Sequence, residues 1–170
     1  MPLPVKFICA FIYLNQETYA KTKAILEKKF GKIDFESESF AFDSTDYYFP
    51  EMGQPLFRRF VSFEKLRNPN QFVDIKIFCM KIEKRFSNQE RRTINIDPGY
   101  LNEAKLILTT TKDFSHRIYL NKGIYAEVTL RFEKGRFTEL TSTFPDYRTS
   151  KYKDIFHTIR NMYRKQIHSS

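Results

Sequence analysis

The apolar stretch at residues 5–13, VKFICAFIY, is the strongest structural signal in the chain and predicts a central β-strand. It is rich in β-branched and aromatic residues and too short to be a lone buried helix. A helix is predicted directly after it, over residues 16–30, because Tyr19, Leu26 and Phe30 fall on one stripe of a helical projection. Gly31 then stands where a helix often ends.

Three more strands, a long loop and a second helix are predicted in the rest of the first half. A strand is predicted over residues 32–43, with a bulge or bend near Ser39, because acidic and aromatic side chains there otherwise share one face. Residues 44–55 are rich in turn formers and contain two prolines, which is typical of either a binding loop or an ordinary hairpin connection. The remaining elements of this half are strands at 56–63 and 91–97 and a helix at 71–86.

The order β-α-β-β-α-β matches the ferredoxin-like arrangement. From residue 104 the pattern becomes all β, with strands predicted at 105–110, 115–120, 124–133 and 136–143. Thr149 is a suitable N-cap for a last helix. We therefore predict an α+β fold in which a ferredoxin-like βαββαβ half is continued by an antiparallel β meander and a C-terminal helix, with one extended sheet able to run through both halves.

The length of 170 residues is that of a single domain. We divide this domain into the βαββαβ-like half at 1–100, the meander at 101–148 and a basic helix at 149–170.

The formal net charge is +9, and it is unevenly distributed. Residues 58–92 contain ten basic and four acidic side chains, and the chain from Thr149 onward contains five basic and one acidic. Such a field attracts phosphates, nucleic acids or anionic surfaces. The basic final helix is either a solvated surface helix or a contact for nucleic acid or a membrane.

The two cysteines, Cys9 and Cys79, lie in apolar runs without a CxxC or histidine partner, so a zinc site is not expected. No apolar run approaches the ~18 residues needed to cross a bilayer, and the first residues lack the order of a secretory signal. We expect no membrane partner and a cytoplasmic location. The sequence also lacks the P-loop, GxGxxG and GxSxG patterns, so it names neither a cofactor nor a reaction.

Chemically capable side chains gather in four patches between residues 95 and 148. Asp97 is either the cap of a Pro-Gly turn or a carboxylate able to bind Mg²⁺ or act as a base. His116 is either an ordinary core or edge histidine or a general acid or base oriented by Asp113. Asp146 is a candidate cap of the last helix, while Arg148 can bind an oxyanion.

A hairpin is predicted around a three-residue loop, 121–123, in which a type I turn precedes a left-handed Gly. This register places Tyr119 opposite Tyr125 and Arg117 opposite Glu127, all four on one strand face, with the apolar residues from Ile118 to Phe132 on the other. Arg117 and Glu127 form either an exposed surface pair or part of a polar cleft. The same alternation places His116 on the apolar face. It can therefore lie near Arg117 and Glu127 only if it is at the edge of its strand.

Several segments resemble a prokaryotic family known as a domain of unknown function, DUF4416. The resemblance is carried by Ile94 to Leu101, Thr111 to Leu120, Gly123 to Leu130 and Pro145 to Arg148, and the loop Tyr48 to Gly53 and the strand Arg59 to Glu64 resemble the first half of that family. Members sometimes carry a GTP-binding label, which no P-loop in this sequence supports.

These observations lead to a first functional hypothesis: binding, with or without turnover, of an anionic phosphate-containing small ligand such as a nucleotide. The candidate catalytic residues are Asp97, Asp113, His116 and Glu127, and the candidate ligand-binding residues are Lys112, Arg117, Tyr119, Tyr125, Asp146 and Arg148. The first alternative is a non-catalytic RNA-binding module that uses the basic surface and the aromatics at 47–49. The second alternative is a structural or assembly protein without a small ligand.

Overall fold

Strand β1 (Lys6–Tyr13) lies at the centre of the protein, and all eight of its residues are buried. In the computed structural model, which describes residues 1–169, it is flanked by β4 (Phe57–Phe63) and β5 (Ile94–Leu101), and both pair with it in antiparallel register. Alternate side chains of β1 enter two different hydrophobic cores, with Phe7 on one face and Ile8 on the other. This explains why the strand is apolar from Phe7 to Tyr13.

The first half has the predicted ferredoxin-like order. Helix α1 (Gln16–Phe30) follows β1, and helix α3 (Phe72–Arg85) connects β4 to β5. The four strands of this half lie in the order β2-β4-β1-β5, with β2 (Ile33–Glu36) at the edge. The smaller elements are β3 (Phe40–Ala41), α2 (Phe49–Met52) and the 3₁₀ turn η1 (Pro69–Gln71).

The second half continues the same sheet. Strands β6 (Lys105–Thr110), β8 (Ile124–Glu133) and β7 (Ile118–Asn121) follow β5 in that spatial order, and β9 (Arg136–Glu139) pairs with β8. All pairings are antiparallel, and the nine-stranded sheet is open. The predicted fold class, including the extended sheet, is therefore confirmed.

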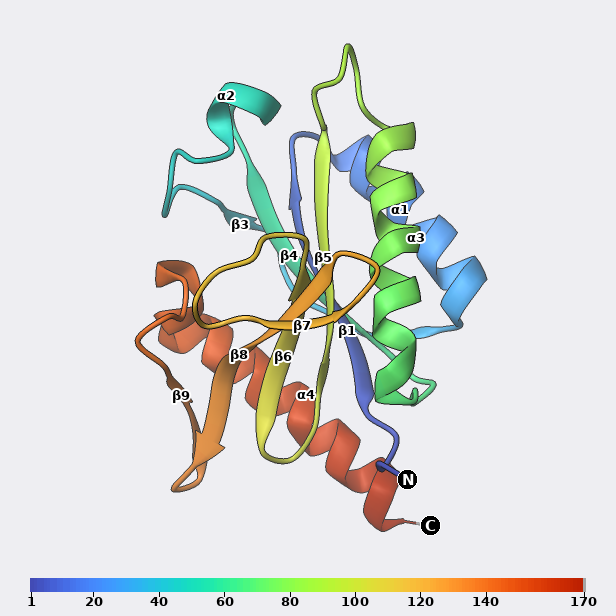
Figure 1. The fold of residues 1–170 in the computed structure, drawn as a ribbon, viewed down its shortest axis with the longest axis vertical. Helices are drawn as coiled ribbons and strands as arrows, with labels where there is room; N and C mark the ends of the chain where they lie inside the picture. The colour runs from blue at the N-terminus through green and yellow to red at the C-terminus, as the bar shows by residue number, and fades with distance from the viewer. Residues whose placement is uncertain (170) are drawn as a thin grey trace.

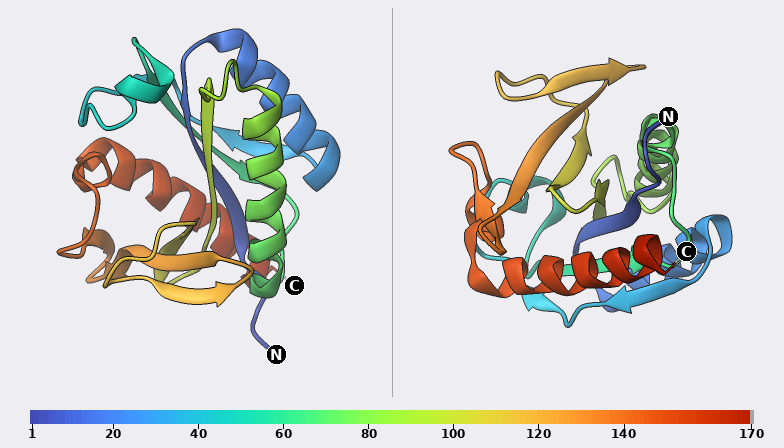
Figure 2. Two further views of the ribbon diagram at one scale, coloured as in Figure 1. Left: turned by 45° about the horizontal axis from the view of Figure 1, so that its top comes forward. Right: turned by 90° about the horizontal axis from the view of Figure 1, so that it is seen from below.

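The two faces of the sheet are covered by different helices (Figure 1). Helices α1 and α3 pack on one side, which we call the α1/α3 face, and α4 (Ser150–His168) packs on the other, the α4 face. In the right-hand view of Figure 2, α4 crosses the lower part of the molecule while β7 lies at the top, and β7 is at the far end of the sheet from β2. No helix among residues 1–169 is both long and apolar enough to cross a membrane.

Several local predictions need correction. The strand predicted at 136–143 ends at Glu139, and the strand predicted at 91–97 begins only at Ile94. The strand predicted at 32–43 is two strands, because residues 37–39 interrupt it; Phe35 and Phe40 consequently both pack against the α4-face core, the reversal expected from a bend near Ser39. Strand β5 does not stop at Asp97 but continues through Pro98 and Gly99 to Leu101. Strand β7 begins only at Ile118, three residues later than predicted.

The β7–β8 hairpin also differs from its predicted turn. Tyr119 lies opposite Tyr125 as predicted, but Asn121, not Leu120, lies opposite Ile124. The connection is a two-residue turn in which Lys122 and Gly123 both have positive φ angles, 51° and 76°. Leu120 is the extra residue in a bulge next to this turn.

Candidate functional site

Outside the hydrophobic core that α4 covers, the α4 face carries a group of charged and polar side chains. We call this region the polar end and define it by Arg58 of β4, Asn95 and Asp97 of β5, Glu127 of β8, and Asp146 of the 3₁₀ turn η2 (Pro145–Arg148).

The strand register explains why these residues share a face. Asp97 lies opposite Ala10, which belongs to the α4-face core. On β4, Arg58 comes two residues before Phe60, which is a member of the same core. Glu127 lies opposite Leu108, which is also part of that core. Because side chains alternate along a strand, all three charged groups point to the α4 side.

Arg58 is a deeply buried cation of the polar end, with a side-chain exposure of 4%. Its Nη2 donates to Oδ2 of Asp146 at 2.7 Å, and its guanidinium lies 4.9 Å from the ring centre of Phe42 and 5.3 Å from that of Tyr147. Burial acts to lower the pKa of Arg58, but Tyr147 and Asp146 outweigh it, so the pKa is raised. The group stays charged inside an aromatic enclosure.

Two donors of Arg58 have no partner within residues 1–169. Nε and Nη1 are both buried and donate no hydrogen bond to any described group, and the buried hydroxyl of Tyr147 beside them has no partner among those residues either. Buried polar atoms in proteins are nearly always hydrogen-bonded. This concentration of unsatisfied donors distinguishes the neighbourhood of Arg58 from an ordinary buried ion pair.

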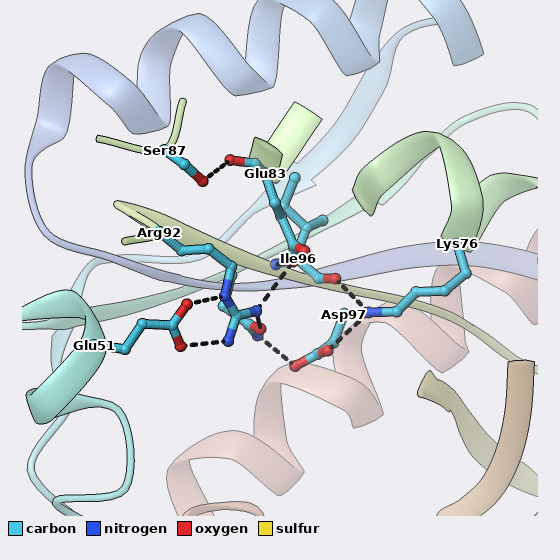
Figure 3. Close-up of polar contacts among 8 residues, drawn as sticks. Glu51, Lys76, Glu83, Ser87, Arg92, Ile96 and Asp97 are labelled. Carbon is cyan, nitrogen blue, oxygen red and sulfur yellow. Dashed lines mark hydrogen bonds and ion pairs between the residues drawn. The ribbon is translucent and has the colours of Figure 1, made fainter. Parts of the chain in front are cut away.

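Asp97 lies in a second cluster, at the point where β5 and β6 separate (Figure 3). Pairing between the two strands begins only at Gly99, so the outer edge of β5 before it has no neighbouring strand. Side chains of helix α3 fill the position of the missing neighbour. Glu83 Oε1 accepts from the Ile96 amide at 2.7 Å, and Lys76 Nζ donates to the Ile96 carbonyl at 2.9 Å. Two buried charged side chains therefore provide the hydrogen bonds that a neighbouring strand would otherwise make to the backbone of β5.

The same lysine neutralises Asp97. Nζ of Lys76 lies 3.3 Å from Oδ1 of Asp97, and Nδ2 of Asn95 donates to Oδ2 at 2.9 Å. Burial acts to lower the pKa of Lys76, but Asp97 and Glu83 outweigh it, so this pKa is raised. Burial raises the pKa of Glu83 despite these cations. Asp97 is thus a paired carboxylate within a strand, and the predicted role as a turn cap is wrong.

Arg92 ties this cluster to helix α2. Its Nε and Nη2 donate to the two carboxylate oxygens of Glu51 at 2.6 and 2.9 Å, and its Nη1 donates to Asn95 Oδ1 at 2.7 Å (Figure 3). The hydrogen bonds from Arg92 lower the pKa of Glu51. The loop at 44–55 is therefore anchored to the sheet by a bidentate ion pair.

A third cluster surrounds Glu127. Its Oε2 lies 2.7 Å from Nε2 of His116 and 3.3 Å from Nε of Arg117, and Nη1 of Arg117 donates to the carbonyl of Lys112 at 3.2 Å. The side chains of Arg117 and Glu127 are only 2% and 6% exposed, so the pair is buried and is not the exposed surface pair considered above. His116 is 30% exposed and reaches the pair because it precedes β7, where strand alternation does not constrain it.

The remaining predicted residues are scattered around this third cluster. The ammonium of Lys112 contacts the hydroxyl of Tyr47 and lies 4.0 Å from the ring centre of that residue. The rings of Tyr119 and Tyr125 meet at 5.3 Å, and burial together with the charge of Asp113 raises the pKa of Tyr125. The loop at 111–117 therefore touches the loop that carries Tyr47.

Asp146 and Arg148 have structural partners. The side chain of Asp146 binds Arg58, so it does not cap α4; Thr149 does, by accepting from the Tyr152 amide. The Arg148 guanidinium donates to the carbonyls of Thr143 and Thr141, at 2.9 and 2.8 Å, and thereby braces its own loop.

The cations and acids contributed by β4, α2 and α3 were not among the predicted site residues. Two of them had a recognisable signal, since Lys76 and Glu83 lie seven residues apart on the buried stripe of a helix, where a charge needs a partner. Arg58 and Arg59 are adjacent in a strand, so one of them has to face each side. Within the described residues 1–169, no group of three or more His, Cys, Asp or Glu side chains is placed to hold a metal ion.

Comparison with known proteins identifies a family but no individual relative. The model of a family described as a domain of unknown function, DUF4416, matches residues 3–163. No curated protein matches the chain, and neither does any solved structure. The chemistry of the polar end is therefore interpreted from its own residues.

Proposed function

The chain belongs to the DUF4416 family, whose description assigns no activity, and we propose from the site itself that the protein binds a small phosphate-containing anion at the polar end. Arg58 is the principal contact in this proposal, and Lys112 contributes charge from the loop at the rim.

The observation that carries the proposal is the pair of unpartnered donors on Arg58. A buried guanidinium whose Nε and Nη1 lack acceptors within residues 1–169 has lost its hydration without full replacement. Phosphate oxygens are strong acceptors, and charge-assisted bonds from arginine are about twice as strong as neutral ones. An anion next to Arg58 would satisfy donors that the protein leaves open.

The acids of the polar end do not oppose this assignment. Asp97 is paired with Lys76, Asp146 with Arg58, and Glu127 with both His116 and Arg117. Because each carboxylate already has a cation beside it, an incoming anion meets little unbalanced negative charge.

His116 is the residue that we assign to proton exchange with the ligand. Its ring is held through Nε2 by the buried carboxylate of Glu127, while 30% of the side chain stays exposed. A carboxylate that orients an imidazole is a common arrangement for general acid or base chemistry. Turnover of a phosphate ester would use this group.

A small ligand is better supported than RNA. On α4, Lys153 pairs with Glu139 and Arg164 with Glu103, while Arg160 is buried over the ring of Phe132. These cations are engaged within the protein. Of the aromatics at 47–49, only Tyr47 is exposed, since the other two pack against a hydrophobic cluster at the loop.

The test is a thermal-shift screen with inorganic pyrophosphate, nucleotides and phosphorylated metabolites, followed by calorimetry on Arg58→Lys. Binding to the folded state raises its apparent stability by mass action. Arg58→Lys keeps the charge and loses the Nε donor, so we expect at least about tenfold weaker binding. Arg59→Lys is the matched control, because Arg59 is adjacent on β4, points to the α1/α3 face and lies over the ring of Tyr19.

Equal affinity of Arg58→Lys and the parent protein would disprove the assignment, and so would a screen in which no phosphate compound raises the melting temperature. If Arg58→Lys does not fold, Lys112→Ala tests the same site from its exposed rim. That variant is expected to weaken binding and to leave the unfolding transition unchanged.

A further inference from the structure

A hollow lies on the opposite side of the sheet from the polar end. It has a volume of about 680 Å³ and lies on the α1/α3 face, between the end of α1, the connection at 67–71 and the first half of α3. The two helices that border it diverge in Figure 1. A volume of this size is typical of small-molecule sites.

The charges around this hollow are mostly positive and unpaired. Lys29 of α1 and Lys81 of α3 make no ion pair with any described residue, and Arg67 has no carboxylate partner in the same part of the chain. The single acid in the lining, Asp74, is already bound through Oδ1 to Lys122 at 2.8 Å. The hollow therefore has an unbalanced positive potential.

Arg67 provides a donor that is directed at no acceptor. Its Nη2 donates to the carbonyl of Phe30 at 2.6 Å, but its Nε is buried and has no hydrogen-bond partner among residues 1–169. Burial lowers the pKa of Arg67, and no acid opposes this effect. A buried guanidinium N–H without a partner is costly unless a ligand supplies the acceptor.

The floor of the hollow is apolar. The rings of Phe30 and Phe78 meet edge to face with centres 5.4 Å apart, and Ile75 also contributes to the lining. The ammonium of Lys29 lies 5.6 Å from the ring centre of Phe78. A hydrocarbon surface thus adjoins the unpaired cations.

We propose that this hollow binds a small amphipathic anion, a carboxylate or sulfonate on an aromatic or aliphatic body. The apolar body packs on Phe78 and Ile75, and the anionic group binds Arg67 together with Lys29 and Lys81. This site is independent of the polar end, because the two lie on opposite faces of the sheet.

The test uses 8-anilinonaphthalene-1-sulfonate, an aromatic sulfonate whose fluorescence rises in apolar surroundings. The site variant is Lys29→Glu with Lys81→Glu, and the matched control is Lys28→Glu with Lys84→Glu. All four lysines are exposed, each pair has one member on α1 and one on α3, and the change in net charge is identical. Only the first pair lines the hollow.

We expect saturable binding to the parent protein, at least about tenfold weaker binding to the site variant, and near-parental binding to the control. In an amide NMR titration, the peaks that shift should include Asn70, Gln71 and Lys81. Equal losses in both variants would mean bulk charge attraction and would overturn the proposal. Unchanged binding in the site variant would overturn it as well, because the dye would then bind elsewhere, for example at the exposed Ile118 and Leu120 of β7.

Discussion

At Gly99 the backbones of β5 and β6 come into close contact. In sequence, Pro98-Gly99 indicates a turn, yet both residues lie inside β5. A Cβ at Gly99 would lie 2.0 Å from the carbonyl oxygen of Ile107 and 2.9 Å from a methyl carbon of Leu108. The glycine is needed because β6 approaches the backbone of β5 closely.

Gly99→Ala is therefore expected to destabilise the protein by at least about 2 kcal/mol, because the backbone of β6 has to move. Urea unfolding measures the change. Gly135→Ala is the control: it has a φ of 80° and open space around the added carbon, so it isolates backbone strain at about 1 kcal/mol. If the two variants lose the same stability, the close approach is not the reason for the glycine.

Glu51 gives a pH dependence with a defined sign. Its pKa is lowered from the ordinary value of 4.5, chiefly by the hydrogen bonds from Arg92. A carboxyl group whose folded pKa lies below its unfolded pKa stabilises the protein fully above the unfolded value. This contribution is lost as the pH falls from 4.5 through the folded pKa.

Unfolding free energies measured from neutral pH down through this window should thus fall less for Glu51→Gln than for the parent protein. The effect is modest because Glu51 is 38% exposed and solvent screens the pair. Glu90→Gln, at an exposed position without an ion pair among the described residues, should follow the parent curve. A Glu51→Gln curve parallel to the parent curve would show that the pair contributes nothing.

At the level of elements, α3 replaces a missing strand. Lys76 and Glu83 bind the carbonyl and the amide of Ile96, where β5 has no neighbour on that side. Lys76→Met would leave Asp97 and this carbonyl without their cation in a buried site. Removing one partner of a buried charge pair typically costs about 3–5 kcal/mol.

We therefore expect Lys76→Met to lower the unfolding free energy by this amount, measured by urea denaturation. Glu83→Gln retains an oxygen that can accept from the Ile96 amide, so it should cost only about 1 kcal/mol. The reverse ranking would contradict the edge-capping role of Lys76.

Strong periodicity made several elements predictable to the residue. The bounds of α1, β6 and β8 agree with those predicted from sequence, and Thr149 caps the last helix as expected. Glu127 and Leu130 were predicted on opposite faces of β8, and this was wrong because of a bulge. The pairing of β8 with β6 skips Thr129, so Leu130 packs on the α4 face together with Glu127. A bulge depends on pairing between distant strands, and no local signal marks it.

The same limit explains the partial prediction of the site. Arg117 and Glu127 are close along one hairpin, so their pairing followed from the predicted register of Tyr119 with Tyr125, although the turn itself differs. Arg58 and Asp146 are 88 residues apart, and their bond depends on how the second half folds back onto β4. Composition identified a basic segment at 58–92, but only the fold shows which of its cations are buried.

On the scale of the whole molecule, the two halves share one core. Phe60 of β4 meets the rings of Tyr152 and Phe156 at 4.8 and 5.1 Å, and the α4-face core joins Ile8 of β1 to Leu130 of β8. The βαββαβ half is therefore covered on its second face by elements that come later in the chain.

This arrangement predicts that a fragment of residues 1–101 does not fold alone. Its Ile8, Ala10, Phe60 and Leu101, all fully buried in the complete chain, would face water without α4 and β6. Burial of a large aliphatic or aromatic side chain contributes about 1.5–3 kcal/mol, so losing several removes an amount comparable with the usual net stability of a small domain. Circular dichroism and amide NMR dispersion compare the fragment with the full chain. A cooperative melting transition in the fragment would show instead that the first half is an autonomous domain and that the single-domain prediction is wrong.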